Sequence, residues 1–322
     1  MTKHRLHSKL AARTTKLALI ATVLAFFVIL LGAFTRLTNA GLSCPDWPNC
    51  YGYLTAPHTS EQIQAATLLY PETPVNIKAA WTEMTHRYFA GCEGLLILAL
   101  AFCLFKLRKQ RLTRSAFTAV LLLVLLCMQV TLGMRTVTQK LNPVVVLSHL
   151  LIGLSILSVL WWTFIRLLNK KALATHMNVK PWLCIALVVV AFQITLGGWV
   201  STHYAGLACI DFPYCNGEIL PNLHLDQFNT DLITIHMLHR IGALVTTLYI
   251  SLMLIVFWTH RTLRKTTMLI FALLALQITL GILNLYWLRP VWLALMHHAV
   301  GILLLLSLIA TLAKTISPLQ DK

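Results

Sequence analysis

Four histidines at matching places in the chain are the residues best able to do chemistry. They are His86 in EMTHRYFAG, His149 in VLSHLLIG, His239 in HMLHRIGAL and His297 in LMHHAVG. Each lies inside an apolar stretch, where an imidazole usually binds a metal or carries a proton, a helix-to-helix hydrogen bond being the alternative. The chain repeats internally, so the four residues form two pairs, His86 with His149 and His239 with His297.

The expected geometry of these pairs favours haem iron. A histidine about eight residues into a helical span lies roughly 12 Å below the outer surface, and all four share that depth. A planar group between two such helices could be ligated on both faces, as haem iron accepts, whereas zinc or copper more often takes closely spaced ligands. A Gly or Ala follows each histidine by four residues and would let a flat macrocycle approach the backbone. His298 is a rival to His297, which is preferred because Gly301 follows it as Gly153 follows His149.

The composition requires a membrane to hold these residues. Of 322 residues, 58% are hydrophobic and 11% charged, and the mean hydropathy is +0.75. Continuously apolar runs of about 20 residues predict an all-α polytopic membrane protein and argue against strands. Eight runs are long enough to cross: 17–37, 80–105, 116–138, 143–165, 182–202, 231–257, 267–287 and 291–313.

The net charge of +16 is explained by the lipid bilayer without a nucleic-acid partner. Nineteen of the 26 Lys and Arg residues lie in segments on one side of the eight-span arrangement. The positive-inside rule places that side, with both termini, in the cytoplasm, and the loops 38–79 and 203–230 outside. The first apolar run continues into a motif, so it is interpreted as a membrane span and not as a cleaved signal.

A duplication organises the chain. GLSCPDWPNCYG (41–52) and GLACIDFPYCNG (206–217) agree at seven positions under a shift of 165 residues. Two four-helix halves with the same orientation are expected, related by a pseudo-twofold axis along the membrane normal. The predicted segments are a basic tail (1–16), the N-terminal half (17–165), a cytoplasmic linker (166–181), the C-terminal half (182–313) and a cytoplasmic tail (314–322). The phrase Gln-x-Thr-Leu-Gly also recurs, at Gln129, Gln193 and Gln277.

Two cysteine pairs in the outer loops predict disulfides. Cys44 and Cys50 lie in the first repeat of the motif, and Cys209 and Cys215 in the second. An oxidising compartment favours disulfides, although four cysteines allow three pairings and a redox role is the alternative to a structural one.

The halves differ beside the first histidine. Glu83 lies three residues before His86, on the same helical face, where the second half has His236 before His239. A carboxylate near a haem edge could shuttle protons or stabilise a cationic intermediate, and a salt bridge to a nearby Arg is the alternative. Glu93, deeper on that face, has no assigned role. The haem propionates could pair with four arginines near the outer surface: Arg36, Arg87, Arg135 and Arg240.

Taken together, these motifs resemble the haem A synthase family, whose members convert haem O to haem A for cytochrome oxidase assembly. The resemblance covers nearly all of 17–313 and rests on the block 36–50, on Glu-x-x-His-Arg (83–87), on His-Arg-x-x-Ala (239–243) and on His149 and His297. It implies haem B as an iron cofactor on His239 and His297, substrate haem O on His86 and His149, and Glu83 as the catalytic carboxylate.

The implied reaction oxidises the C8 methyl group of haem O to a formyl group by successive hydroxylations, with electrons from the resident haem B. Haem O synthase and an electron donor such as quinol are the expected partners. Two other functions stay open: a non-catalytic dihaem cytochrome and a haem carrier. The sequence does not identify the donor, the source of the oxygen or whether the chain forms a homo-oligomer.

Overall fold

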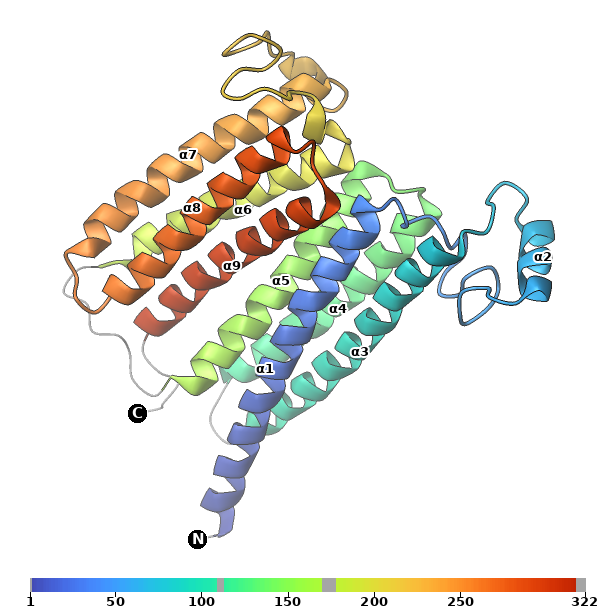
Figure 1. The fold of residues 1–322 in the computed structure, drawn as a ribbon. Coiled ribbons are helices and arrows are strands. Elements are labelled where there is room, and N and C mark those ends of the chain that lie inside the picture. Colours follow the sequence, from blue (N-terminus) through green and yellow to red (C-terminus); the bar gives the residue numbers. More distant parts are fainter. Residues whose placement is uncertain (1, 109–112, 170–177, 317–322) are drawn as a thin grey trace. The chain divides into compact units, whose positions relative to one another are not determined.

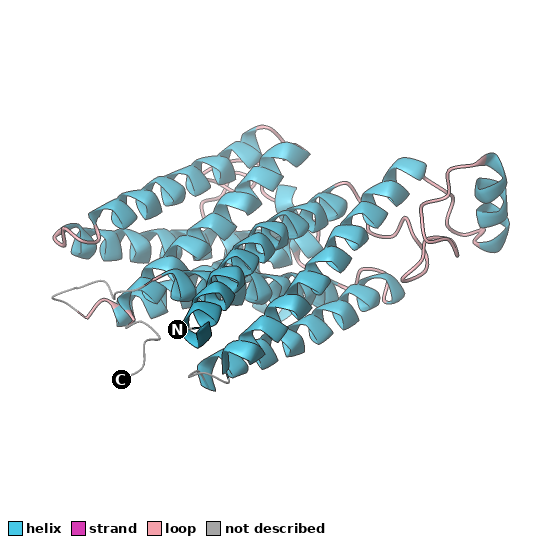
Figure 2. Cartoon of the chain, turned by 90° about the horizontal axis from the view of Figure 1, so that it is seen from below, coloured by secondary structure: helices cyan, strands magenta, loops and turns pink. Residues whose placement is uncertain are grey.

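The fold is helical, with eight helices among the described residues long and apolar enough to cross a membrane. The computed structural model describes residues 2–108, 113–169 and 178–316, and no strand occurs in those ranges (Figures 1 and 2). The predicted all-α polytopic membrane protein is therefore confirmed. The spanning helices are α1 (Thr2–Leu37), α3 (Ile77–Arg108), α4 (Thr113–Thr138), α5 (Pro143–Leu168), α6 (Lys180–Thr202), α7 (Leu232–Trp258), α8 (Arg264–Tyr286) and α9 (Val291–Thr315).

The chain divides into two compact units, Met1–Phe164 and Ile165–Gln320, and each is described by itself. In the first, α3 packs against both α1 and α4. In the second, α6, α7, α8 and α9 each pack against the next, and α9 returns to α6, which closes a ring of four helices. The pseudo-twofold axis and the predicted segment boundaries stay predictions. Most of the linker (166–181) and of the tail (314–322) lies outside the described residues.

A short helix in the first cysteine loop was not predicted. The cysteine motifs are 165 residues apart and the His-Arg pairs 153, so the first loop is 12 residues longer than the second. Helix α2 (Ser60–Leu69) lies in this extra length. Its signal is a capping box, in which the Thr59 hydroxyl accepts from the Gln62 backbone N–H and the Gln62 side chain accepts in return from the Thr59 N–H.

Matching tight turns position two of the histidines. Lys140 and Leu141 before α5, and Leu288 and Arg289 before α9, all have positive φ, between 48° and 58°. A proline ends each turn, where its fixed φ suits a helix start. His149 and His297 each follow the first residue of their helix by six residues, which places both about 9 Å below that point.

Candidate functional site

Each of the four histidine rings packs against a glycine of the preceding membrane-spanning helix. A Cβ at that glycine would approach the ring Cε1 to 3.0–3.2 Å, closer than ordinary contact, so a side chain there would push the ring away. Three of these glycines end the repeated phrase Gln-x-Thr-Leu-Gly, but the sequence analysis gave none of the four a role. The pairs are Gly32 on α1 with His86 on α3, Gly133 on α4 with His149 on α5, Gly197 on α6 with His239 on α7, and Gly281 on α8 with His297 on α9.

The residue four positions before each glycine also contacts the ring. Three of these residues are glutamines, whose amide nitrogens lie near a ring nitrogen: 3.4 Å for Gln129 and His149, 3.0 Å for Gln193 and His239, and 3.2 Å for Gln277 and His297. The repeated phrase Gln-x-Thr-Leu-Gly is therefore a histidine-packing motif. Its recurrence was visible in the sequence, but its use depends on which helices are neighbours.

His86 is the exception, because α1 carries Val28 where the other helices carry glutamine. The His86 ring hydrogen-bonds to the backbone carbonyl of Val28 instead. A main-chain carbonyl is available whatever the side chain, so the histidine keeps its place without the amide.

The glycines that follow two of the histidines have a different neighbour from the one expected. A Cβ at Gly153 would lie 3.1 Å from the amide nitrogen of Gln129, and one at Gly301 would lie 3.3 Å from that of Gln277. The space that was predicted to admit a flat macrocycle is thus occupied by the glutamine that contacts the histidine.

The structure brings the histidines together as the predicted pairs. His86 lies close enough to His149, and His239 to His297, for the charge of one ring to act on the other. His297 lies close enough to His239 to act on it electrostatically, which favours His297 as its pair. Throughout the described ranges, no three His, Cys, Asp or Glu residues converge on a metal-ion position, so each pair offers two ligands.

The histidines have the chemistry that haem iron needs. Among the described residues, the buried Nδ1 of His86, His149 and His297 has no hydrogen-bond partner, while the Nε2 of His149 and His297 lies beside a glutamine amide of the neighbouring helix. In His239 it is Nδ1 that lies beside the glutamine. A buried imidazole fixed by a neighbouring group and keeping a free nitrogen suits a metal ligand. The residues present therefore fit a bis-histidine haem in each half.

Glu83 forms an ion pair with Arg87, one helical turn further along α3. The Arg87 Nε donates to Glu83 Oε1 at 3.0 Å, and both side chains are largely buried. The salt bridge considered as the alternative role of Glu83 thus exists, and it fixes the carboxylate one turn outward of His86. In the second half, His236 takes this position and hydrogen-bonds to the backbone of Ala205.

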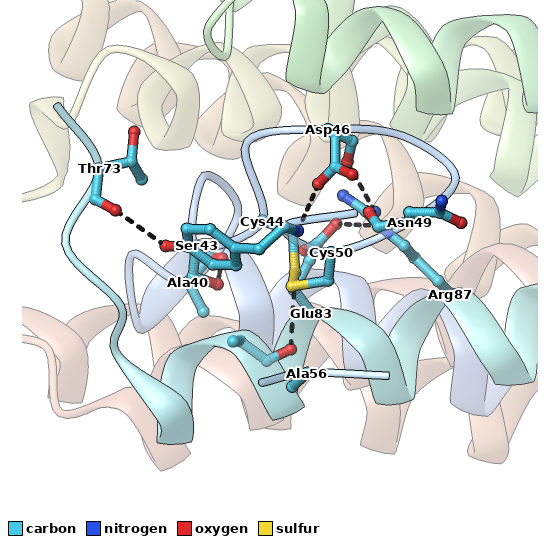
Figure 3. Close-up of a disulfide and its surroundings, with 12 residues drawn as sticks. Ala40, Ser43, Cys44, Asp46, Asn49, Cys50, Ala56, Thr73, Glu83 and Arg87 are labelled. Atoms are coloured by element: carbon cyan, nitrogen blue, oxygen red, sulfur yellow. Dashed lines mark hydrogen bonds and ion pairs between the residues drawn. A yellow bond between two sulfur atoms is a disulfide. The ribbon is translucent and has the colours of Figure 1, made fainter. Parts of the chain in front are cut away.

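Arg87 also holds the first cysteine loop against α3. Its Nη1 donates to the carbonyl oxygens of Asp46, Pro48 and Asn49, at 3.0, 3.3 and 2.7 Å (Figure 3). One guanidinium therefore links this loop to the Glu83 carboxylate.

Arg240 holds the second cysteine loop against α7 in the same way. It donates to the carbonyl oxygens of Cys209, Asp211 and Tyr214 at 2.8, 3.0 and 2.8 Å. Arg87 Nη2 and Arg240 Nε are buried without a partner, while Arg36 and Arg135 lie in the last turns of α1 and α4. Pairing of the four arginines with propionates stays a prediction.

Both predicted disulfides form within their own loops. Cys44 bonds to Cys50, and Cys209 to Cys215, which settles the three pairings that the sequence left open. Both bridges are fully buried, the first among residues that include Ala80 and Met84 of α3, and the second beside Met237 of α7. Each bridge thus shapes the loop that covers the outer end of a histidine-bearing helix.

The second loop should loosen in acid. Backbone N–H groups of Gly217 and Asn216 donate to the Asp211 carboxylate and lower its pKa below the ordinary value. The stabilisation is complete above about pH 4, the pKa of an unfolded Asp, and is lost as pH falls through the lower folded pKa. Hydrogen exchange at Gly217 should therefore quicken below about pH 4, once corrected for intrinsic rates. In Asp211→Asn this extra acid sensitivity should vanish, and an identical profile in both proteins would contradict the assignment.

Comparison with known proteins gives the family. The family model described as "Cytochrome oxidase assembly protein" matches residues 15–309. A haem A synthase of Shewanella oneidensis is 38% identical, over 92% of this chain and 94% of its own length. Haem A synthases of Neorickettsia sennetsu and Granulibacter bethesdensis are 28% and 29% identical, over 89% and 88% of this chain and 94% and 82% of their own. On a match over nearly its whole length, the chain belongs to the cytochrome oxidase assembly protein family.

Proposed function

We propose that this protein is a haem A synthase that oxidises the C8 methyl group of haem O to a formyl group. The observation that carries the proposal is the asymmetry between the halves. Both have a histidine pair that fits haem, but within the described part of the chain only the first has a buried carboxylate, Glu83, one turn from a histidine. Several relatives bear the name haem A synthase, which supports the same conclusion.

The two histidine pairs would have different tasks. His239 and His297 would hold a resident haem B, and His86 and His149 would hold the substrate haem O. When bound, the haem groups supply the redox chemistry that an unactivated methyl group requires. A dihaem cytochrome would need the same four histidines but no Glu83, whereas a carrier would need only a loosely held haem in one half.

The residues around the first pair would place the substrate and manage protons. Glu83, held by Arg87 Nε, can accept or return a proton at its carboxylate beside the substrate. The loop 44–50, fixed on Arg87 by three carbonyls, covers the outer end of α3 and limits access of water to Glu83. In the second half, His236 fills the same position without a carboxylate.

The protein is a multi-pass membrane protein, and we place it in the bacterial inner membrane. The basic segments support a cytoplasmic location of both termini, and the buried disulfides support an outer location of the cysteine loops. Haem O synthase as the source of substrate and quinol as the electron donor remain our proposals for partners, and assembly as a homo-oligomer is compatible with them.

The direct test is to co-express the chain with a source of haem O and to identify the haems extracted from the membranes by chromatography and mass. Haem A or its hydroxylated intermediate is expected with the protein and not with an empty vector. Haem B and unconverted haem O alone, with electron supply shown to be intact, would favour a cytochrome or a carrier.

The two disulfides should differ in their effect on activity. Cys44→Ala with Cys50→Ala frees the loop that fixes Arg87, and so loosens the ion pair with Glu83. Cys209→Ala with Cys215→Ala is the matched control on Arg240. Each double variant should lose about 2 kcal/mol of loop stability, as closure of a short loop predicts, but only the first should lose most haem A formation. Limited proteolysis and haem chromatography check both, and equal activity losses would contradict the link to Glu83.

A further inference from the structure

Glu93 on α3 is a buried carboxyl group that the proposed mechanism does not use. The residue is 6% exposed, and both carboxylate oxygens are buried with no hydrogen-bond partner among the described residues. Burial of such a group is costly unless it is paired, and an ionisable residue inside a membrane span usually has a function. Nothing in the fold accounts for this one.

Glu93 lies on the same face of α3 as His86. Seven residues are about two helical turns, so the two side chains leave the helix within roughly 20° of each other and about 10 Å apart along the axis. Glu83 lies on the outer side of His86, and Glu93 on the inner side. The histidine that would bind substrate thus has a carboxyl group on each side.

The helix opposite offers Glu93 no partner. Helices α1 and α3 pack side by side and run in opposite directions (Figure 1), and Gly32 of α1 meets His86. Seven residues deeper on α1 is Ala25, followed by Ala21 and Ala18, all buried. Thr22, also buried there, donates its hydroxyl to the Ala18 carbonyl of its own helix, so this surface of small residues leaves the hydrogen-bonding capacity of Glu93 for a ligand.

The second half lacks this group. Thr246 follows His239 at the same spacing as Glu93 follows His86, and its hydroxyl donates to the Gly242 carbonyl of its own helix at 2.7 Å. Among the described residues, a buried carboxyl group without a partner therefore occurs only in the half that carries Glu83, which suggests a ligand that the second half does not bind.

We propose that Glu93 recognises the hydroxyl group that haem O carries and haem B lacks, and so selects the substrate. The inference rests on the proposed function. Haem O has a hydroxyethylfarnesyl chain in place of one vinyl group of haem B. Charged propionates favour the outer surface and the isoprenoid chain favours hydrocarbon, which puts the hydroxyl at the inner edge of the macrocycle, on the side of Glu93. A carboxylate accepts from a hydroxyl, and a carboxylic acid can also donate to one.

The test measures which haem the first half retains. The chain is purified from membranes that contain both haem O and haem B, and bound haems are quantified by chromatography. Wild type should hold about one haem B and one haem O or its product. Glu93→Leu should shift the ratio of haem O and product to haem B on the order of tenfold toward haem B. Glu93→Thr, which reproduces the second half, should do the same, while Glu93→Gln should keep most of the preference.

Controls separate selection from folding. Thr246→Val should leave the ratio unchanged, and Glu93→Leu should melt no lower than wild type, because it removes an unpaired buried polar group. An unchanged ratio in Glu93→Leu and Glu93→Thr, with or without slower haem A formation, would overturn this inference and leave the proposed function standing. A wild-type chain that neither retains haem O nor forms haem A would overturn the proposed function and this inference with it.

Discussion

Glu83→Ala should reduce haem A formation roughly 100-fold or more, the usual range for loss of a general acid or base, while the protein keeps its haem. The carboxylate lies one turn from His86, is largely buried and is fixed by Arg87 at 3.0 Å. Neither histidine pair includes Glu83, so removing it should block chemistry and spare ligation. Haem chromatography of membranes measures the product, and the absorption spectrum of the purified protein measures the bound haem.

Two further variants make this prediction specific. Glu83→Gln keeps an oxygen acceptor for the Arg87 guanidinium but cannot take up a proton, so it should be folded and equally inactive. His236→Gln, at the matched position of the second half, should retain most activity because that position has no carboxylate to lose. Haem A formation by Glu83→Gln at the wild-type rate would show that Glu83 only anchors Arg87.

His297→Ala should lose the resident haem of the second half, whereas His298→Ala should keep it. His297 packs on Gly281 and Gln277, as the other candidate ligands pack on their glycines, and lies close to His239. Removal of a group outside the ligand shell of a metal costs about 10–100-fold in affinity, so removal of a ligand should cost at least about 100-fold. Haem content per chain and the spectrum of a bis-histidine iron distinguish the two variants.

A variant that creates a cavity tests the same assignment by the recovery of haem binding as well as by its loss. His297→Gly leaves space beside Gly281, and imidazole added to the buffer should restore part of the haem content and its spectrum. Retention of haem by His297→Ala together with its loss from His298→Ala would reverse the assignment. The ligand would then be His298, whose Nε2 is buried with no hydrogen-bond partner among the described residues.

The same packing of a histidine ring on a glycine recurs at all four candidate haem ligands. In each half, two helices carry a histidine, and two preceding helices carry the glycine that receives its ring. Glutamine contacts three rings, and the backbone carbonyl of Val28 bonds the fourth. His86 is thus the ring without a side-chain amide, and it is also the ring beside Glu83. The site proposed to exchange substrate for product is thus the one with a histidine that no glutamine side chain contacts.

The sequence alone determined the spans, the repeat and the candidate residues, because each depends on local composition or spacing. Apolar runs of span length require helices in a membrane. The recurrence of the motif around Cys44 and Cys209 reveals the duplication, and an intramembrane His86 or Glu83 is conspicuous because burial of a polar group is costly. Helix α2 could also have been predicted from the sequence, because Thr59 and Gln62 have the spacing of a capping box.

Only the tertiary structure decided which groups meet. The disulfide pairing depends on how each loop folds back on itself, and the use of Gly133 and Gln129 depends on α4 lying beside α5. The contacts of Arg87 with Glu83 and with three loop carbonyls likewise became visible only in the fold. Hydrogen bonds and close packing join residues that are distant in the chain, so composition and periodicity identify the groups but not their partners.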